Sequence, residues 1–229
     1  MADSPTFGRY AAATLPARRT ALLLVDMQHY FVDPRHPFGR QLAQVIPEAS
    51  AAYFQRVREI VLSNAQRLLE AFRKRGEFVA FTEFGSLERS GADLPGWARR
   101  HNARGIESVG SPVYPCLEDP SCRIDPVVAP RPGELVLRKN TSGPLNASAL
   151  DRTLRTLGID TVVICGLVTD VCVTQSAREF GDRDFDAIVV EDACATVNET
   201  RHLAALESLA TSFGFVARTV DVLRLLGGN

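Results

Sequence analysis

Short apolar segments alternate along this chain with longer amphipathic ones. An apolar run of four to eight residues without polar alternation is typical of a strand that is buried on both faces, and helix-covered parallel sheets are built from such strands. The sequence therefore predicts a three-layer α/β/α sandwich with a mostly parallel sheet. The expected strands lie at 20–26, 77–83, 134–139, 160–166, 185–192 and 213–218.

Helical periodicity fills most of the space between these strands. A long helix is expected to end at Gly76, where glycine can terminate it. The segment 84–133 is rich in Gly, Pro and Ser, so we expect an irregular segment that covers or lines a site. The expected helices lie at 49–75, 146–157, 170–181 and 198–211.

Length and charge narrow the class of protein. The chain has 229 residues, of which 45% are hydrophobic, so we expect one domain over residues 1–229, with 1–19 as an N-terminal extension. The net charge is −1 without a block of like charge, which argues against nucleic acid or an anionic membrane as partner. The N-terminus resembles neither a signal peptide nor a membrane span, so a cytoplasmic location is expected.

Five cysteines form an odd set without CxxC pairs or zinc-like Cys/His spacing, which argues against a disulfide framework and a structural zinc site. Cys165 and Cys194 lie in apolar segments and are interpreted as small buried hydrophobic residues. Cys172 differs, because it follows a strand at the expected start of a helix. At least this thiol is available for chemistry.

Three predicted strands end near side chains that can act in catalysis, the carboxyl group of Asp26, the ammonium group of Lys139 and the thiol of Cys172. Because ligands bind beyond the carboxyl ends of parallel strands, we expect these side chains to meet in one crevice. Thr169 is a good N-cap residue, which would place Cys172 at the third helical position, near the positive end of the helix dipole. That position and a neighbouring Lys139 would lower the pKa of the thiol, and Asp26 could accept its proton.

Each of these residues also has an ordinary explanation: a turn or capping Asp, a solvated Lys, a packed Cys. Together they favour a cysteine hydrolase, although many α/β proteins have polar strand ends. A non-catalytic ligand-binding protein is the alternative from another class. Neither GxGxxG after the first strand nor GxxxxGK[ST] is present, so a phosphate-binding site has no support in the sequence.

Four segments, in this order, resemble the motifs of the isochorismatase-like, or cysteine hydrolase, superfamily. They are ALLLVDMQHYFVDP, GELVLRKNTSG, VVICGLVTDVCVTQSARE and AIVVEDACAT. The resemblance extends from about Thr20 to Phe215, and it implies a Rossmann-like sheet with an Asp26–Lys139–Cys172 triad. It also implies a cis peptide bond between Leu167 and Val168, and an oxyanion hole formed by the N–H groups of Val168 and Cys172.

The resemblance also suggests the reaction and its range. It implies hydrolysis of a small non-peptide amide or ureide through a thioester, with isochorismatase-type vinyl-ether hydrolysis as the alternative. The Asp-x-His metal pair of nicotinamidases is absent, so we expect neither a metal nor another cofactor. Relatives commonly form dimers or tetramers, which makes a homodimer or homotetramer the expected assembly. The residues expected to line or brace the substrate site are Gln28, Tyr30, Phe31, Trp97 and Leu167.

Overall fold

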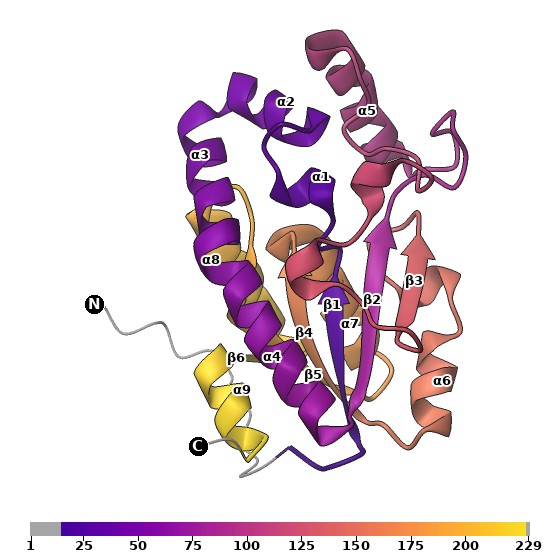
Figure 1. Ribbon diagram of the computed structural model, residues 1–229, viewed down its shortest axis with the longest axis vertical. Coiled ribbons are helices and arrows are strands. Elements are labelled where there is room, and N and C mark those ends of the chain that lie inside the picture. The colour runs from indigo at the N-terminus through magenta and orange to yellow at the C-terminus, as the bar shows by residue number, and fades with distance from the viewer. Residues whose placement is uncertain (1–14, 228–229) are drawn as a thin grey trace.

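A parallel sheet forms the centre of the computed structural model, which describes residues 15–227 (Figure 1). Within these residues the sheet has six strands in the order β3-β2-β1-β4-β5-β6. Every strand runs parallel to its neighbours. The strands are β1 (Thr20–Val25), β2 (Phe78–Phe84), β3 (Leu135–Lys139), β4 (Thr161–Leu167), β5 (Asp186–Ala195) and β6 (Phe215–Ala217).

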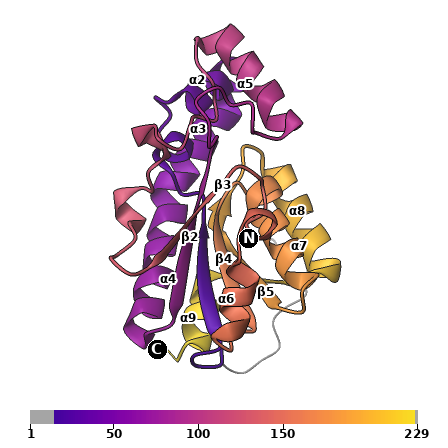
Figure 2. The same ribbon diagram turned by 90° about the vertical axis from the view of Figure 1, so that its right-hand side faces the viewer.

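Helices cover both faces of this sheet. Helices α4 and α9 pack on one face of the sheet, and α6, α7 and α8 pack on the other (Figures 1 and 2). The helices are α1 (His29–Val32), α2 (Pro37–Val45), α3 (Pro47–Arg56), α4 (Leu62–Arg75), α5 (Gly96–Val109), α6 (Leu150–Thr156), α7 (Thr174–Gly181), α8 (Glu199–Ser212) and α9 (Thr219–Leu225). Short turns of 3₁₀ or π helix are η1 (Val57–Val61), η2 (Pro120–Cys122), η3 (Pro126–Val128), η4 (Leu145–Ala147) and η5 (Thr169–Val173).

The central strands β1 and β4 explain why the apolar segments of the sequence do not alternate with polar residues. Every residue of β1 and of β4 is buried, because each strand has a neighbour on both sides and helices on both faces. Such strands contribute apolar side chains to two layers at once, so their sequences do not alternate. The three-layer sandwich and its parallel sheet are therefore as predicted.

The segment 84–133 departs from the prediction. We expected irregular chain, but the structure contains the 14-residue helix α5 in it. The helix begins after Pro95 and ends at Gly110, so the residues that made the segment look irregular are its boundaries. Figure 1 shows α2 and α5 beyond the carboxyl ends of the strands, where they cover that end of the sheet.

Two further differences concern other segments. The predicted helix at 49–75 consists of α3, η1 and α4 in succession and ends at Gly76 as expected. In the predicted N-terminal extension, residues 1–14 lie outside the described residues, while Leu15 is buried and donates its N–H to the carbonyl of Leu225. No helix within residues 15–227 is long and apolar enough to cross a membrane.

Gly166 lets β4 approach β1 closely just before the strand ends. Its φ is +133°, and a Cβ at this position would collide with the backbone carbonyl of Val25. Only glycine combines this backbone conformation with this spacing. The close approach brings the end of β4 beside Asp26, which follows β1.

Candidate active site

Asp26, Lys139 and Cys172 meet beyond the carboxyl ends of β1, β3 and β4. The Nζ atom of Lys139 lies 2.7 Å from Oδ2 of Asp26, and their side chains are 1% and 0% exposed. Cys172 lies in η5 and is 2% exposed. Both Asp26 and Lys139 act on the pKa of its thiol, so the three groups form one electrostatic cluster. The structure thus brings together the three residues that the sequence singled out.

Neighbouring strands and loops fix the charged pair. The hydroxyl of Thr82 on β2 donates to Oδ1 of Asp26 at 2.6 Å, which leaves Oδ2 to Lys139. Lys139 Nζ also donates to the carbonyls of Thr141 and Ser142, at 3.2 and 3.1 Å. An ammonium group has three hydrogens, so these three acceptors hold it in a single orientation. Nζ lies 5.0 Å from the centre of the Phe84 ring.

The pKa of the Cys172 thiol is raised, whereas the helix dipole and Lys139 led us to expect a lowered pKa. Burial raises the pKa of the Cys172 thiol; the positive charge of Lys139 opposes this, and the charge of Asp26 adds to it. For Lys139, burial acts to lower the pKa, but the negative charge of Asp26 opposes this and the pKa lies above its ordinary value. The cluster therefore consists of a neutral thiol beside the ion pair of Asp26 and Lys139.

The chain turns sharply before Cys172. The peptide bond between Leu167 and Val168 is cis, as expected. The carbonyl of Val168 accepts hydrogen bonds from the N–H groups of Val171 and Val173, at 3.1 and 3.3 Å. Val168, and not Thr169, occupies the N-cap position, so Cys172 is the fourth helical residue and not the third. Thr169 was wrongly predicted as the cap because its hydroxyl is bound elsewhere, to His202.

Aromatic rings gather on the side of the cluster that faces α5. Trp97 stacks on Phe84 with ring centres 5.8 Å apart, and Tyr114 meets both rings edge-on, at 5.3 Å from Phe84 and 5.6 Å from Trp97. His101 lies beside Trp97 and Tyr114. Burial raises the pKa of Tyr114. Phe84 joins this aromatic cluster to the ion pair, because its ring centre lies 5.0 Å from Nζ of Lys139.

Comparison with protein families agrees with this arrangement. The Isochorismatase domain model matches residues 20–221. The chain belongs to the isochorismatase family. It is therefore an isochorismatase-family hydrolase, and the resemblance found in its sequence motifs is confirmed.

Individual relatives extend this result. The chain is 27% identical to the ureidoacrylate amidohydrolase RutB of Methylobacterium radiotolerans over 96% of this chain and 88% of that protein. It is also 27% identical to the maleamate amidohydrolase of Pseudomonas putida, over 91% and 87%. Both matches cover most of each chain and are not confined to the quoted motifs.

Solved structures show the same fold. A cysteine hydrolase from Pseudomonas syringae pv. phaseolicola superposes with a TM-score of 0.76 at 23% identity, covering 98% of both chains. The N-carbamoylsarcosine amidase from Thermoplasma acidophilum superposes with a TM-score of 0.64 at 25% identity, covering 88% of this chain and 96% of that one.

Two of the residues expected to line or brace the substrate site, Gln28 and Tyr30, are held by hydrogen bonds inside the protein. Gln28 is fully buried, and its amide spans Phe84 and Cys122: it donates to both carbonyls, at 3.1 and 2.8 Å, and accepts from the N–H of Phe84 at 2.8 Å. It braces the loop after β1. Tyr30 is also buried and donates its hydroxyl to the Phe84 carbonyl at 2.9 Å.

Phe31, Trp97 and Leu167 lie in or beside the aromatic cluster or at the cis peptide, and their contact with substrate stays a prediction. Phe31 is buried with its ring 6.2 Å from that of Tyr114, and Trp97 belongs to the aromatic cluster described above. Leu167 is buried where the cis peptide begins. Asp192 lies within β5 and accepts from the N–H and hydroxyl of Thr219 at the start of α9, so it satisfies donors at the beginning of that helix.

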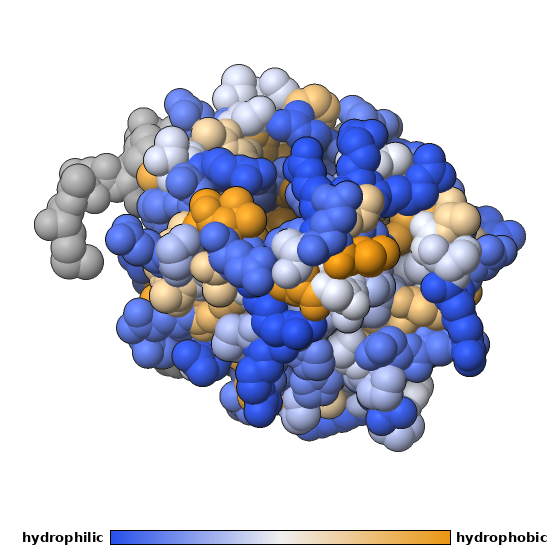
Figure 3. All heavy atoms as spheres, turned by 90° about the horizontal axis from the view of Figure 1, so that it is seen from above, coloured by the Kyte–Doolittle hydropathy of each residue, from blue (hydrophilic) through white to orange (hydrophobic). Residues whose placement is uncertain are grey.

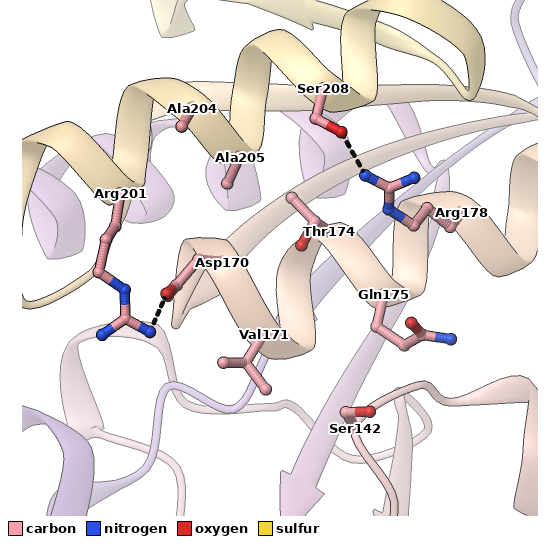
Figure 4. Close-up of a pocket in the computed structure, with 10 residues that line it drawn as sticks. All are labelled: Ser142, Asp170, Val171, Thr174, Gln175, Arg178, Arg201, Ala204, Ala205 and Ser208. Carbon is pink, nitrogen blue, oxygen red and sulfur yellow. Dashed lines mark hydrogen bonds and ion pairs between the residues drawn. The ribbon is translucent and has the colours of Figure 1, made fainter.

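Three polar residues near the site were missed by the sequence reasoning. Asp170, two residues before Cys172, accepts from Thr196 at 2.6 Å and pairs with Arg201 of α8 at 2.5 Å. The Asp170–Arg201 pair borders a groove of about 500 Å³ along α7 and α8 that extends to Ser142 (Figure 4). Asp170 and Thr196 lie within two of the quoted motif segments, but Arg201 lies outside them, and only the packing of η5 against α8 brings it to Asp170.

His202 is buried and bound to Thr169, so it is not a surface histidine. Among residues 15–227, no group of three or more His, Cys, Asp and Glu side chains is placed to hold a metal ion.

Proposed function

We propose that this protein hydrolyses a small non-peptide amide or ureide, with Cys172 as nucleophile and a thioester intermediate. The observation that carries the proposal is the carboxylate–ammonium pair of Asp26 and Lys139, buried beside the thiol of Cys172. A thiol whose pKa is raised needs a base at the moment of attack, and a buried carboxylate provides one. The names of the relatives, ureidoacrylate amidohydrolase and maleamate amidohydrolase, agree with this reaction.

The reaction proceeds in two halves. Asp26 accepts the thiol proton as the sulfur of Cys172 bonds to the substrate carbonyl carbon, and the protonated Asp26 then gives this proton to the leaving nitrogen as the C–N bond breaks. Water next attacks the thioester and gives a proton to Asp26, the C–S bond breaks, and that proton returns to the sulfur. Lys139 keeps Asp26 oriented and compensates its charge, and it exchanges no proton.

The tetrahedral intermediate carries a negative oxygen that needs donors. The N–H groups of Val168 and Cys172 flank the turn after the cis peptide, and we assign the oxyanion hole to them. Donors that are fixed before the reaction stabilise developing charge most effectively. The aromatic cluster of Phe84, Trp97 and Tyr114 then forms one wall of the substrate site, and Phe31 adjoins it.

Positive charge near the aromatic cluster favours an anionic substrate. After burial, the charges of Arg104, Arg100 and Arg201 lower the pKa of His101, so these three residues contribute a positive field at its ring. His101 borders Tyr114, so the positive field extends to the proposed substrate wall. Guanidinium groups bind carboxylates well, and ureidoacrylate and maleamate, which name two of the relatives, are carboxylates.

The test is ammonia release from a panel that pairs anionic amides and ureides with neutral ones, without added metal. Ureidoacrylate, maleamate and N-carbamoylsarcosine form the anionic arm; biuret and nicotinamide form the neutral arm. Cys172→Ala should abolish release, whereas the control Cys116→Ala, which removes a partly exposed thiol outside the cluster, should leave it unchanged. Ammonia release that survives Cys172→Ala would contradict the thioester, and the absence of release from every compound would redirect attention to vinyl-ether substrates.

A further inference from the structure

The turn that carries Cys172 is tied to the helices behind it through Thr169. This residue follows the cis peptide and is completely buried, and its Oγ1 atom lies 2.9 Å from Nδ1 of His202 on α8. The proposed oxyanion donors are the N–H groups of Val168 and Cys172, so Thr169 lies between them in the chain. Its side chain therefore connects the centre of the turn to helix α8.

Arg56 at the end of α3 contacts the other side of the His202 ring. Its Nη2 atom lies 3.4 Å from Nε2 of His202. The same guanidinium is held by two carbonyls of β5, those of Cys194 at 3.3 Å and Glu191 at 3.4 Å. Arg56 is thus fixed to the backbone of the sheet and not only to the histidine.

Elementary hydrogen-bond chemistry then determines the state of the ring. A guanidinium group only donates hydrogen bonds, so Nε2 of His202 must accept from Arg56. The ring hydrogen is then on Nδ1, which donates to the hydroxyl oxygen of Thr169. A second proton would place a positive ring against the Arg56 guanidinium, so the arrangement requires a neutral histidine.

The charges around the ring agree with this state. Burial and then the charge of Arg56 lower the pKa of His202 to about 4, and the weaker effect of Asp170 in η5 opposes them. Arg201 compensates Asp170 from the same helix as His202. The ring is therefore neutral at neutral pH, with its hydrogen on one defined nitrogen.

We propose that Arg56, His202 and Thr169 form a positioning relay, in which the neutral Nδ1–H tautomer of His202 holds the turn that presents Cys172. The relay runs from α3 across the end of β5 and α8 to η5, so four elements share one hydrogen-bonded line. None of the three side chains is assigned a contact with substrate. The kinetic part of the proposal rests on the proposed function, because it requires turnover of an amide.

The relay acts through the placement of backbone atoms. Without the bond to His202, the turn keeps its fold but loses the restraint on the direction of the N–H groups on either side of Thr169. Small displacements of reacting groups lower the rate strongly without abolishing binding, with losses of up to about 10²-fold for a misplacement near 1 Å. A residue that serves stability alone would lower the melting temperature and leave the turnover of the folded enzyme unchanged.

Thr169→Val tests this distinction because it removes the hydroxyl and keeps the shape. The matched control is Thr20→Val, at a buried threonine of β1 whose hydroxyl donates to the Pro16 carbonyl at 2.9 Å, at the opposite end of the strand. We expect Thr169→Val to lower kcat at least about tenfold with little change in KM, and Thr169→Ser to restore most of it. Equal kcat values for Thr169→Val and Thr20→Val would overturn the relay.

Two measurements keep this result separate from the substrate assignment. Nitrogen-15 NMR of labelled His202 in the intact protein should show the Nδ1–H tautomer, and the Nε2–H tautomer or a charged ring at pH 7 would overturn the proposal. The rate at which iodoacetamide alkylates Cys172, followed by mass spectrometry, should fall in Thr169→Val and stay unchanged in Thr20→Val. The NMR spectrum and the alkylation rate can both be measured even if no tested amide is hydrolysed. That lack of hydrolysis would contradict only the proposed function. An alkylation rate of Cys172 that is unaffected by Thr169→Val would overturn the relay.

Discussion

The ammonium nitrogen of Lys139 lies 2.7 Å from a carboxylate oxygen of Asp26, and neither side chain is more than 1% exposed. Asp26 and Lys139 follow or end two strands that are separated by β2, and Thr82 of β2 supplies the hydroxyl that orients the carboxylate. The sheet thus builds a buried ion pair from three parallel strands. In the proposed mechanism this pair supplies the base that the neutral thiol of Cys172 requires.

Removing one member of the pair should destabilise the protein strongly. Lys139→Met leaves the Asp26 carboxylate buried without its cation, for which we expect a loss of about 3–5 kcal/mol in the free energy of unfolding. The double variant Asp26→Asn/Lys139→Met should recover part of this loss, because it leaves no buried charge. Urea unfolding measures both.

An exposed ion pair provides the control for this experiment. Arg89 and Glu118 pair at 2.9 Å with side chains that are 88% and 66% exposed. Arg89→Met should change the free energy of unfolding by less than about 1 kcal/mol. Similar losses for Lys139→Met and Arg89→Met would contradict the view that burial determines the energetics of the Asp26–Lys139 pair.

Acid should destabilise the protein partly through His202. Its pKa is about 4 in the folded protein against an ordinary value of 6.5, so the unfolded chain binds a proton more readily between these values. The contribution of His202 is complete above pH 6.5 and is lost as the pH falls toward 4, by up to about 3 kcal/mol. His202→Asn cannot titrate, so its unfolding free energy should depend less on pH in this window. Parallel pH profiles for the two proteins would refute the assignment.

The fold and the Asp26–Lys139–Cys172 cluster were predictable because their signals are local. The buried strands β1 and β4 produce unbroken apolar runs; Asp26 follows β1, Lys139 ends the edge strand β3, and Cys172 lies in the turn after β4. The support for these groups was not predictable, because it depends on distant parts of the chain. Thr169 was expected to cap its own helix and instead contacts His202, 33 residues away.

Two predictions failed for related reasons: that segment 84–133 is irregular, and that the pKa of Cys172 is lowered. The sequence of α5 is bounded by Pro95 and Gly110, and these residues made the entire segment resemble a loop. For Cys172, the helix dipole and Lys139 suggested a lowered pKa, but burial outweighs them. The depth of a side chain follows from tertiary packing, which a local motif does not encode.

Glu179 of α7 should control the loop that orients Lys139. Its carboxylate accepts from the N–H of Leu145 at 2.8 Å and from the amide of Asn146 at 2.6 Å, and a Cβ at Gly143 would overlap it. Glu179→Gln replaces an acceptor by a donor, and we expect a loss of about 1–3 kcal/mol with faster amide exchange at 143–146. Glu59→Gln, in an exposed i,i+4 pair with Gln55, is the control and should have little effect on either measurement.

Arg201 should distinguish anionic from neutral substrates. It is 59% exposed, pairs with Asp170 and contributes to the positive field at His101. Arg201→Gln should raise KM for a carboxylate-bearing amide about tenfold, since a hydrogen bond to a charged group is worth about 1.5–3 kcal/mol, and should change KM for a neutral amide much less. Arg224→Gln, in an exposed pair with Asp221 on α9, is the control. Equal changes in KM for both substrate types would argue against this role.

The most direct test of the account is to trap the enzyme during turnover and measure its mass. Acid quenching with a hydrolysed amide should reveal wild-type protein heavier by the acyl group, with the added mass on the peptide that contains Cys172. Cys172→Ala should show neither adduct nor product. Product formation by the Cys172→Ala variant, or an adduct located on another residue, would contradict the claim that Cys172 is the nucleophile.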